Sequence, residues 1–381
     1  MNQDLGLRIL GRIMDWDDDR AREEFAWLKL MARLKYDGYR DFQAGMRFIE
    51  SLATWLQQFE PHERETAYAF VRHTLVYIGP SEMQRLVEQF YPRAVRDRLF
   101  RMVAAECDIP PHRVLIDADA RAAIERLQRQ TLFMGLSDGA RIDTIRHANA
   151  GLLGNEQFVQ GTQVDTEKWR DLIENLRKDL DEPDARFRLV YLVDDFAGTG
   201  TSFLRFDERT GKWKGKLIRF RESVESANKA LDGDKLFEDG WVLCVHHYVA
   251  SSHAAGAVQK RLERLAGNGD FPEDWAQTTH PSFGMVLPQD LPINAAAGRH
   301  DDFIELTRTY YDPVIRTKHT DVGGVTHLGL GYGDCALPLV LEHNTPNNSV
   351  ALLWAETDGG VRDGASAPAM RPLFRRRHRH G

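Results

Sequence analysis

The first 115 residues carry apolar side chains at helical spacing. Proline and glycine at positions 61, 79–80 and 110–111 divide this pattern into segments, and strand-like alternation is scarce. Spacings of three and four residues place apolar side chains on one face of a helix. The pattern predicts a helical domain over residues 1–115, with no motif that indicates a chemistry. The apolar groups are Leu5, Ile9, Leu10 and Ile13; Phe25, Leu28, Met31 and Leu34; Phe48, Leu52, Trp55 and Leu56; and Ala69, Val71, Leu75 and Val76.

From about residue 117 short apolar runs alternate with amphipathic helical segments. This alternation is typical of parallel sheets whose strands are joined by right-handed crossover helices. A polar stretch at 154–164 fits a loop or an edge strand, and residues 207–217 resemble an inserted hairpin. We therefore expect an α/β fold. Strands are expected at 131–136, 188–193, 241–249 and 336–341, and helices at 117–130, 166–180, 219–231 and 254–266.

Composition indicates an ordinary soluble protein, since 42% of the 381 residues are hydrophobic and 28% are charged. No segment approaches the roughly 20 apolar residues that span a bilayer, so no membrane contact is expected. Three cysteines that lie far apart in sequence predict reduced thiols in a cytoplasmic protein. The net charge of −7 gives no general reason to expect nucleic-acid binding.

The last eleven residues are basic, with five arginines and two histidines. Such a charge run at a terminus predicts a solvated, disordered tail, which we expect over residues 361–381. Three parts are thus expected along the chain. They are a helical domain at 1–115, a domain with the parallel sheet at 116–360, and the tail.

Residues 190–202 hold the most specific motif, Val-Tyr-Leu-Val-Asp-Asp-Phe-Ala-Gly-Thr-Gly-Thr-Ser. Its apolar start suits a buried parallel strand. Asp194 and Asp195 follow at the carboxyl end of that strand, where ligands bind in open α/β sheets. Glycine and hydroxyl residues then let backbone N–H groups approach an anion, especially with a helix start near Ser202. Two carboxylates and a phosphate loop together suit a ribose 5-phosphate.

This motif closely resembles the 13-residue ribose-phosphate signature of the type I phosphoribosyltransferases and matches it throughout. The resemblance implies a phosphoribosyltransferase-like parallel sheet flanked by helices over residues 116–360. It also implies that Asp194 and Asp195 hold the ribose hydroxyls and are the residues for the cofactor Mg²⁺. The loop that would wrap the 5-phosphate consists of Ala197, Gly198, Thr199, Gly200, Thr201 and Ser202.

Other interpretations of the motif lack supporting features. The magnesium-binding strand of a phosphate-loop NTPase requires Gly-x-x-x-x-Gly-Lys-[Ser/Thr], and the chain has no such string. A dinucleotide site requires a third glycine where Phe203 stands. A strand and a glycine turn without any ligand is the plain structural alternative.

Residues 137–141, Ser-Asp-Gly-Ala-Arg, are the best second element of the site. They follow a predicted strand, at the position where the resemblance implies a pyrophosphate-binding loop. Arg141 suits bidentate binding of pyrophosphate, and Ser137, Asp138 and Gly139 complete the loop. The structural alternative is that Asp138 caps a helix while Arg141 forms a surface ion pair.

Three further segments support weaker hypotheses. His246 and His247 face opposite sides of a strand, which disfavours a metal site with His253. His247 or Tyr248 is a candidate for the border of a nucleobase pocket. Residues 329–333 contain the glycines of a methyltransferase loop, but no continuous apolar strand precedes them.

The segment at 343–348, His-Asn-Thr-Pro-Asn-Asn, precedes an apolar run at 350–354. Its asparagines and proline are typical of a turn. It also resembles a turn in phosphoribosyltransferase-like proteins of bacterial conflict loci, which include antiphage systems, some built around retron reverse transcriptases. That resemblance implies an antiphage-defence role. A reverse transcriptase or DNA-binding protein is then the expected partner of residues 1–115.

These features predict a phosphoribosyltransferase-like protein that binds phosphoribosyl pyrophosphate or a nucleotide. Asp194, Asp195 and Arg141 are the expected catalytic residues for transfer at ribose C1. One alternative is a regulator that keeps the ribose-phosphate site as a sensor without catalysis. Another is an interaction protein whose helical segment binds a reverse transcriptase or nucleic-acid complex. The sequence does not identify the acceptor of the transfer.

Overall fold

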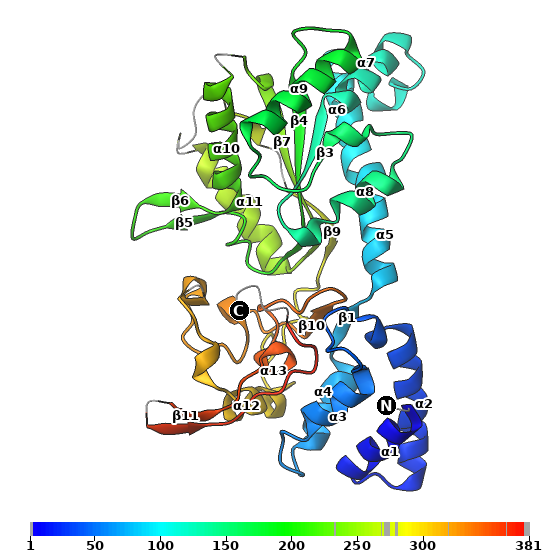
Figure 1. The fold of residues 1–381 in the computed structure, drawn as a ribbon, viewed down its shortest axis with the longest axis vertical. Coiled ribbons are helices and arrows are strands. Elements are labelled where there is room, and N and C mark those ends of the chain that lie inside the picture. Colours follow the sequence, from blue (N-terminus) through cyan, green and yellow to red (C-terminus); the bar gives the residue numbers. More distant parts are fainter. Residues whose placement is uncertain are drawn as a thin grey trace. The chain divides into compact units, whose positions relative to one another are not determined.

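The chain folds into two compact units, residues 84–287 and residues 1–83 with 288–381. Figure 1 labels the elements of both. These boundaries differ from the expected ones at 115 and 360. The helices after residue 83 pack on the central sheet, and the segment after residue 287 packs with the N-terminal helices. The computed structural model describes residues 3–231, 234–267, 269, 275–278, 281–318, 320–362 and 364–376.

Among the described residues, a six-stranded parallel sheet forms the centre of the 84–287 unit. Its order is β3-β2-β4-β7-β8, and β9 also pairs with β7. In register, Val193 lies beside Gly135 on one side and His246 on the other. The strands are apolar because helices cover both faces of a parallel sheet. They are β2 (Thr131–Gly135), β3 (Phe158–Val159), β4 (Phe187–Ala197), β7 (Phe237–Ala250), β8 (Gln277–Thr278) and β9 (Ser282–Val286).

Helices pack on both faces of this sheet (Figure 1). On one face, Leu192 shares a core with Trp169 and Phe220. On the other, the Phe90 ring meets that of Tyr191 edge-on, with centroids 5.3 Å apart. The expected α/β class is therefore confirmed. The helices are α5 (Pro80–Phe90), a π-helical turn (Tyr91–Val95), α6 (Arg96–Glu106), α7 (Ala118–Arg129), α8 (Ile142–Ala148), α9 (Thr166–Leu180), α10 (Lys216–Ala230) and α11 (Ser252–Gly267).

The expected insertion is a β-hairpin of β5 (Arg205–Asp207) and β6 (Lys212–Lys214). The helix expected at 219–231 is α10 (Lys216–Ala230), whereas the condition of a helix start near Ser202 is not met. The hairpin is the physical reason, because it separates the small-residue loop from the helix that follows.

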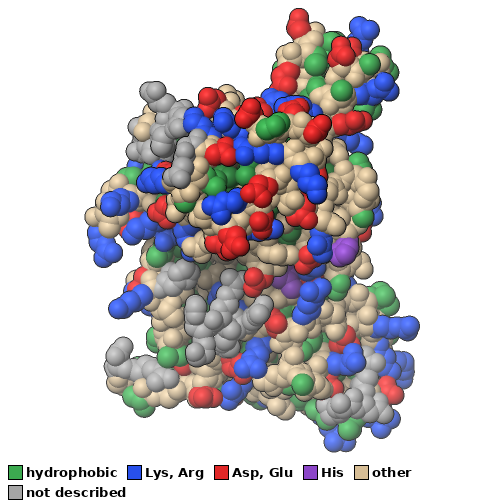
Figure 2. Space-filling model, turned by 45° about the horizontal axis from the view of Figure 1, so that its top comes forward, with side chains coloured by type: hydrophobic (Ala, Val, Ile, Leu, Met, Phe, Trp, Pro, Cys, Tyr) green, Lys and Arg blue, Asp and Glu red, His purple; other side chains and the backbone are tan. Residues whose placement is uncertain are grey.

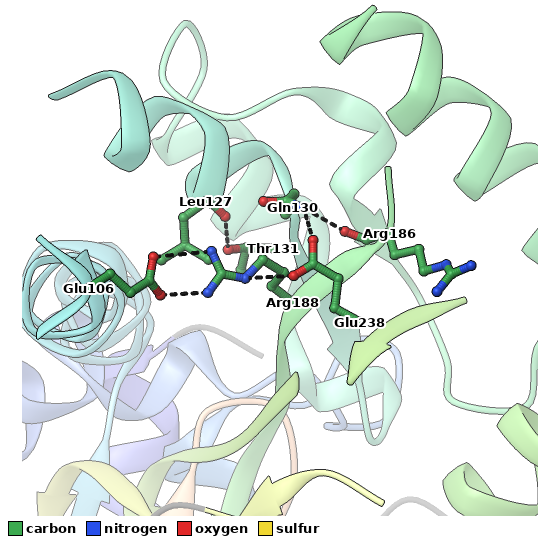
Figure 3. A network of polar contacts seen from close by, with 7 residues as sticks. All are labelled: Glu106, Leu127, Gln130, Thr131, Arg186, Arg188 and Glu238. Carbon is green, nitrogen blue, oxygen red and sulfur yellow. Dashed lines mark hydrogen bonds and ion pairs between the residues drawn. The ribbon is translucent and has the colours of Figure 1, made fainter. Parts of the chain in front are cut away.

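A polar network joins the strand ends opposite to the aspartates (Figure 3). Arg188 of β4 donates to Glu106 of α6 at 2.5 Å and pairs with Glu238 of β7 at 3.1 Å. Gln130, directly before β2, donates to the same Glu238 at 2.8 Å. These bonds connect α6 to the amino-terminal ends of β2, β4 and β7. This end of the sheet is remote from the aspartates.

The other unit is mainly helical and has its own core. The Trp55 indole N–H donates to the Leu352 carbonyl at 2.7 Å, and the rings of Phe70 and Phe303 stack with centroids 3.8 Å apart. The strand expected at 336–341 pairs here with β1, outside the main sheet. The elements are α1 (Gln3–Ile13), α2 (Asp18–Leu34), α3 (Phe48–Leu56), α4 (Arg64–His73), β1 (Val76–Ile78), α12 (Asp301–Thr309), β10 (Leu339–Leu341) and α13 (Ala351–Trp354).

The segment expected as a disordered tail packs into this unit as far as Phe374. Strand β11 (Gly360–Arg362) pairs with β12 (Ala365–Ala367). Met370, Leu373 and Phe374 are buried, and Phe374 stacks on Phe48. The expectation weighed the arginines and overlooked the apolar side chains between them. Residues 377–381 of the expected tail lie outside the described residues.

The surface carries charges of both signs. Figure 2 shows basic and acidic side chains interspersed over the face that it draws, in keeping with the net charge of −7. Among the described helices, none is long and apolar enough to cross a membrane. Surface charge by itself therefore indicates no class of partner.

Candidate functional site

Asp194 and Asp195 lie near the carboxyl end of β4, a central strand of the sheet. Neighbouring strand residues point to opposite faces, so the two side chains occupy different environments. Asp194 is opposite His247 in register and only 2% exposed. Asp195 is partly exposed. The two acids look equivalent in the sequence and are distinct in the structure.

Groups from three segments bind the Asp194 carboxylate. Oδ1 accepts hydrogen bonds from the Ser137 hydroxyl and, at 3.2 Å, from the Asp195 backbone N–H. Lys216 Nζ lies 2.5 Å from Oδ2. Burial raises the pKa of the Asp194 carboxyl, and the Lys216 ammonium opposes that shift. A buried charge of this kind needs such a partner.

The expected loop at 137–141 does lie beside the aspartates. Gly139 approaches Asp195 so closely that a β-carbon at this position would collide with the carboxylate. From the neighbouring strand, the Tyr248 hydroxyl donates to the Ala140 carbonyl at 2.8 Å. Glycine and tyrosine therefore fix the position of this loop against the acid pair.

Arg141 ends the loop in a left-handed conformation, with φ 52° and ψ 42°. This conformation is uncommon for a residue other than glycine. Arg141, and not Asp138, precedes α8, which has no side-chain cap; the structural alternative for Asp138 is therefore wrong. Burial raises the pKa of Tyr248, the charge of Arg141 opposes the shift, and both aspartates add to it. The three charges thus lie within electrostatic reach of one phenol.

Neighbouring side chains hold the small-residue loop at 197–202 by its carbonyls. Arg261 of α11 donates to the Thr199 carbonyl at 2.8 Å. The Ser251 hydroxyl donates to the Gly198 carbonyl at 2.6 Å. Gly200 has a φ of 69°, which favours glycine. These bonds give the loop a defined shape without a ligand.

The hairpin returns the chain to the small-residue loop. The Lys216 N–H donates to the Ser202 carbonyl at 3.0 Å, and the Leu217 N–H donates to that of Phe203 at 3.1 Å. Gly215 has a φ of 130°, and a β-carbon there would collide with the Phe203 carbonyl. The N-terminus of α10 therefore abuts the end of the loop in spite of the insertion, and its first two N–H groups are taken up by backbone carbonyls.

Lys216 is the site residue that sequence reasoning missed. Its signal was a lysine three residues before the helix predicted at 219–231, but it stood within the segment 207–217, which was interpreted only as an insertion. Tyr248 was considered for a nucleobase pocket, and the structure gives it a bond to the 137–141 loop instead. His247 is 1% exposed, and burial lowers its pKa to about 4.

The three histidines singled out in the sequence make separate contacts. His246 Nδ1 lies 2.9 Å from the Ser282 hydroxyl, and His253 is exposed on α11. Within the described ranges, no group of three or more His, Cys, Asp or Glu side chains could hold a metal ion.

The two remaining motifs serve turns in the other unit. Gly331 lies against the carbonyls of Asn348 and Ser349, where a β-carbon would be too close. The Asn348 side-chain amide donates to the Tyr332 carbonyl at 3.1 Å. These contacts give the 329–333 glycines and the 343–348 segment a joint structural role.

Comparison with known proteins adds one match. The family model PRTase-CE matches residues 52–376, which include both the 137–141 loop and the 190–202 motif. No curated protein and no solved structure matched the chain. The resemblance drawn from residues 190–202 is thereby confirmed at the level of the family. The chain belongs to the PRTase-CE family, a phosphoribosyltransferase-type family.

Proposed function

We propose that this chain binds phosphoribosyl pyrophosphate, or a nucleotide made from it, and makes or breaks the bond at ribose C1. The observation that carries the proposal is the meeting of three segments at the aspartates. They are the 137–141 loop, the 197–202 loop and the start of α10. Together they offer acceptors for ribose hydroxyls and donors for phosphate.

Each segment has a role in this proposal. Asp195 is partly exposed, and its carboxylate accepts hydrogen bonds from ribose hydroxyls. Asp194 supports it from the buried side of the strand. Backbone N–H groups and hydroxyls of residues 197–202 bind the 5-phosphate. Arg141 neutralises the pyrophosphate.

The proposed chemistry depends on charge. Cleavage at C1 develops positive charge on the ribose, while the departing pyrophosphate carries negative charge. Asp195 would stabilise the first and Arg141 the second. Catalysis would then rest on positioning and on electrostatic groups fixed before the ligand arrives.

Magnesium fits this site as an ion shared with the ligand. Mg²⁺ is usually held by one or two carboxylates together with substrate phosphates. Asp195 is partly exposed whereas Asp194 is buried, so Asp195 and ligand oxygens are the proposed ligands. When bound, the ion would neutralise charge on the pyrophosphate.

Isothermal titration with phosphoribosyl pyrophosphate and Mg²⁺ tests the proposal. We expect Asp195→Asn to weaken binding by at least about tenfold, because a charged acceptor is lost. The matched control is Asp119→Asn, at an exposed position of α7, and it should bind as the unaltered chain does.

A folded, unaltered chain that gives no binding heat would reject the proposed ligand. Release of pyrophosphate or of a nucleobase, measured on the same sample, separates an enzyme from a sensor. Binding without either product would assign the chain as the ribose-phosphate sensor described above.

A further inference from the structure

The backbone of Arg141 has a conformation that needs support from its surroundings. Its φ of 52° and ψ of 42° lie in the left-handed region. This region costs free energy for a residue with a β-carbon and persists only where neighbouring groups hold it. The orientation of the peptide unit between Ala140 and Arg141 sets this φ. It also sets the point from which the Arg141 side chain leaves the loop.

Tyr248 holds that peptide unit from the neighbouring strand β7. Its side chain is fully buried, and its hydroxyl donates to the Ala140 carbonyl at 2.8 Å. This carbonyl belongs to the same peptide unit as the Arg141 nitrogen. The Ala140 N–H in turn donates to the Ser137 carbonyl at 3.0 Å. The two bonds together fix the turn that leads into Arg141.

The surroundings of Tyr248 keep its phenol protonated. Burial raises the pKa of this hydroxyl well above its usual value, the charge of Arg141 opposes the shift, and both aspartates add to it. The hydroxyl is therefore a donor at neutral pH. Without it, the buried Ala140 carbonyl would lose this donor, which is costly away from water.

Other side chains shape the loop that is proposed to bind the 5-phosphate. Arg261 donates to the Thr199 carbonyl and Ser251 to the Gly198 carbonyl. The Tyr248 hydroxyl is bonded to the 137–141 loop instead. A change at this hydroxyl thus acts on the pyrophosphate side of the proposed site and leaves the bonds of the 5-phosphate side in place.

We propose that Tyr248 is a positioning residue that acts through Arg141 on the pyrophosphate group of the ligand. This inference rests on the proposed function. The phenol holds the peptide unit before Arg141, so that the guanidinium is in place before the ligand arrives. Tyr248 itself touches neither the ribose nor a phosphate.

The test compares phosphoribosyl pyrophosphate with ribose 5-phosphate, each titrated with Mg²⁺ into the full chain. The readout is the ratio of the two dissociation constants, because the ligands differ only in the pyrophosphate. We expect Tyr248→Phe to reduce the preference for phosphoribosyl pyrophosphate by about fivefold, on the scale of one neutral hydrogen bond. Its affinity for ribose 5-phosphate should stay the same, which also shows that the variant is folded.

Tyr191→Phe is the matched control. Tyr191 is a buried tyrosine of the adjacent strand β4, and its hydroxyl donates to the Ala94 carbonyl at 3.0 Å. The same atom is removed from the same kind of bond, but away from the 137–141 loop. The preference should not change in this variant. If Tyr248→Phe weakens both ligands equally or changes neither, Tyr248 is only structural and the inference is wrong.

A second background shows whether Tyr248 acts through Arg141. Arg141→Gly removes the guanidinium, and glycine adopts the left-handed conformation without support. Tyr248→Phe added to this variant should reduce the preference no further, since the two changes remove one shared effect. A further loss of about fivefold in the double variant would overturn the inference.

The unaltered chain separates the two levels of the proposal. If it binds neither ligand, the proposed function fails and this inference fails with it. If it binds both and Tyr248→Phe keeps the preference for phosphoribosyl pyrophosphate, the proposed function stands and only the role of Tyr248 is rejected.

Discussion

At the scale of single residues, the site depends on contacts that cross between segments. Asp194 and Asp195 were predicted from the strand and the signature, and so was the loop with Gly139. Lys216 was not, because its partner lies 22 positions earlier in the sequence and an inserted hairpin stands between them. A local pattern indicates a residue type and does not show which buried acid it will meet.

Gly139→Ala tests the contact between the 137–141 loop and Asp195. The added β-carbon would collide with the carboxylate, so the loop or the acid must move. We expect ligand affinity to fall by about tenfold, on the scale of one lost charged hydrogen bond.

Gly256→Ala is the control for that change. Gly256 lies within α11 and has open space around it, so alanine there should leave affinity unchanged and raise stability by about 0.5–1 kcal/mol. Affinity that is unchanged in Gly139→Ala as well would contradict the assigned role of the loop.

Acid should destabilise the chain through its buried histidines. Burial lowers the pKa of His246 to about 3 and that of His247 to about 4, whereas an unfolded histidine titrates near 6.5. Below about pH 6.5 the two histidines take up protons in the unfolded chain but remain neutral in the folded chain. The free energy of unfolding that these histidines contribute is therefore fully present above that pH and is lost as the pH falls toward 4.

Urea unfolding at pH 7.5 and 5.5 measures this loss. We expect each buried histidine to lower the free energy of unfolding by up to about 1.4 kcal/mol for each pH unit below 6.5. His247→Asn should reduce the pH dependence, and the exposed His253→Asn should not. If the unaltered chain and both variants show the same pH dependence, the pKa of His247 is not lowered in the folded chain.

At the scale of elements, periodicity predicted the centre of the α/β unit, since α9, β2, β4 and β7 lie where the apolar patterns placed them. The short strands β8 and β9 were not predicted. The hairpin at β5 and β6 was also expected. No helix starts near Ser202; instead, the small-residue loop meets α10 through space, by the Lys216 and Leu217 backbone bonds. The spacing of apolar residues along the sequence cannot predict a connection of this kind.

Arg188→Met tests the polar network at the amino-terminal ends of the strands. Loss of the bonds to Glu106 and Glu238 (Figure 3) should lower the free energy of unfolding by about 1 kcal/mol, because these side chains are partly exposed. Ligand affinity should stay the same, since the network lies away from the aspartates. The exposed Arg121→Met is the control, and equal stability of the two variants would refute a structural role for the network.

At the scale of the whole molecule, the sequence predicted the presence of a helical part but not its boundary. Residues 84–115 belong with the sheet because Phe90 packs on Tyr191 and the Tyr191 hydroxyl donates to the Ala94 carbonyl at 3.0 Å. The C-terminal segment joins the N-terminal helices through Phe374 and its neighbours. Long-range pairing of this kind has no signal in the hydrophobic pattern of either segment.

Truncation separates the two possible boundaries. We expect removal of residues 1–115 to prevent folding of the sheet unit, because it deletes α5 and α6 and exposes the apolar face that they cover. A fragment of residues 80–287 keeps both helices and should unfold in a more cooperative thermal transition than a fragment of residues 116–287. If the shorter fragment, 116–287, is equally stable, the expected boundary at 115 is the better description.

The central claim is that a ribose 5-phosphate occupies the space between the 137–141 loop, Asp195 and the 197–202 loop. A crystal structure of the chain soaked with ribose 5-phosphate tests it most directly. The account predicts the phosphate on the N–H groups of residues 197–202 and the ribose hydroxyls on Asp195. A sugar bound elsewhere, with these loops in contact only with solvent, would contradict it.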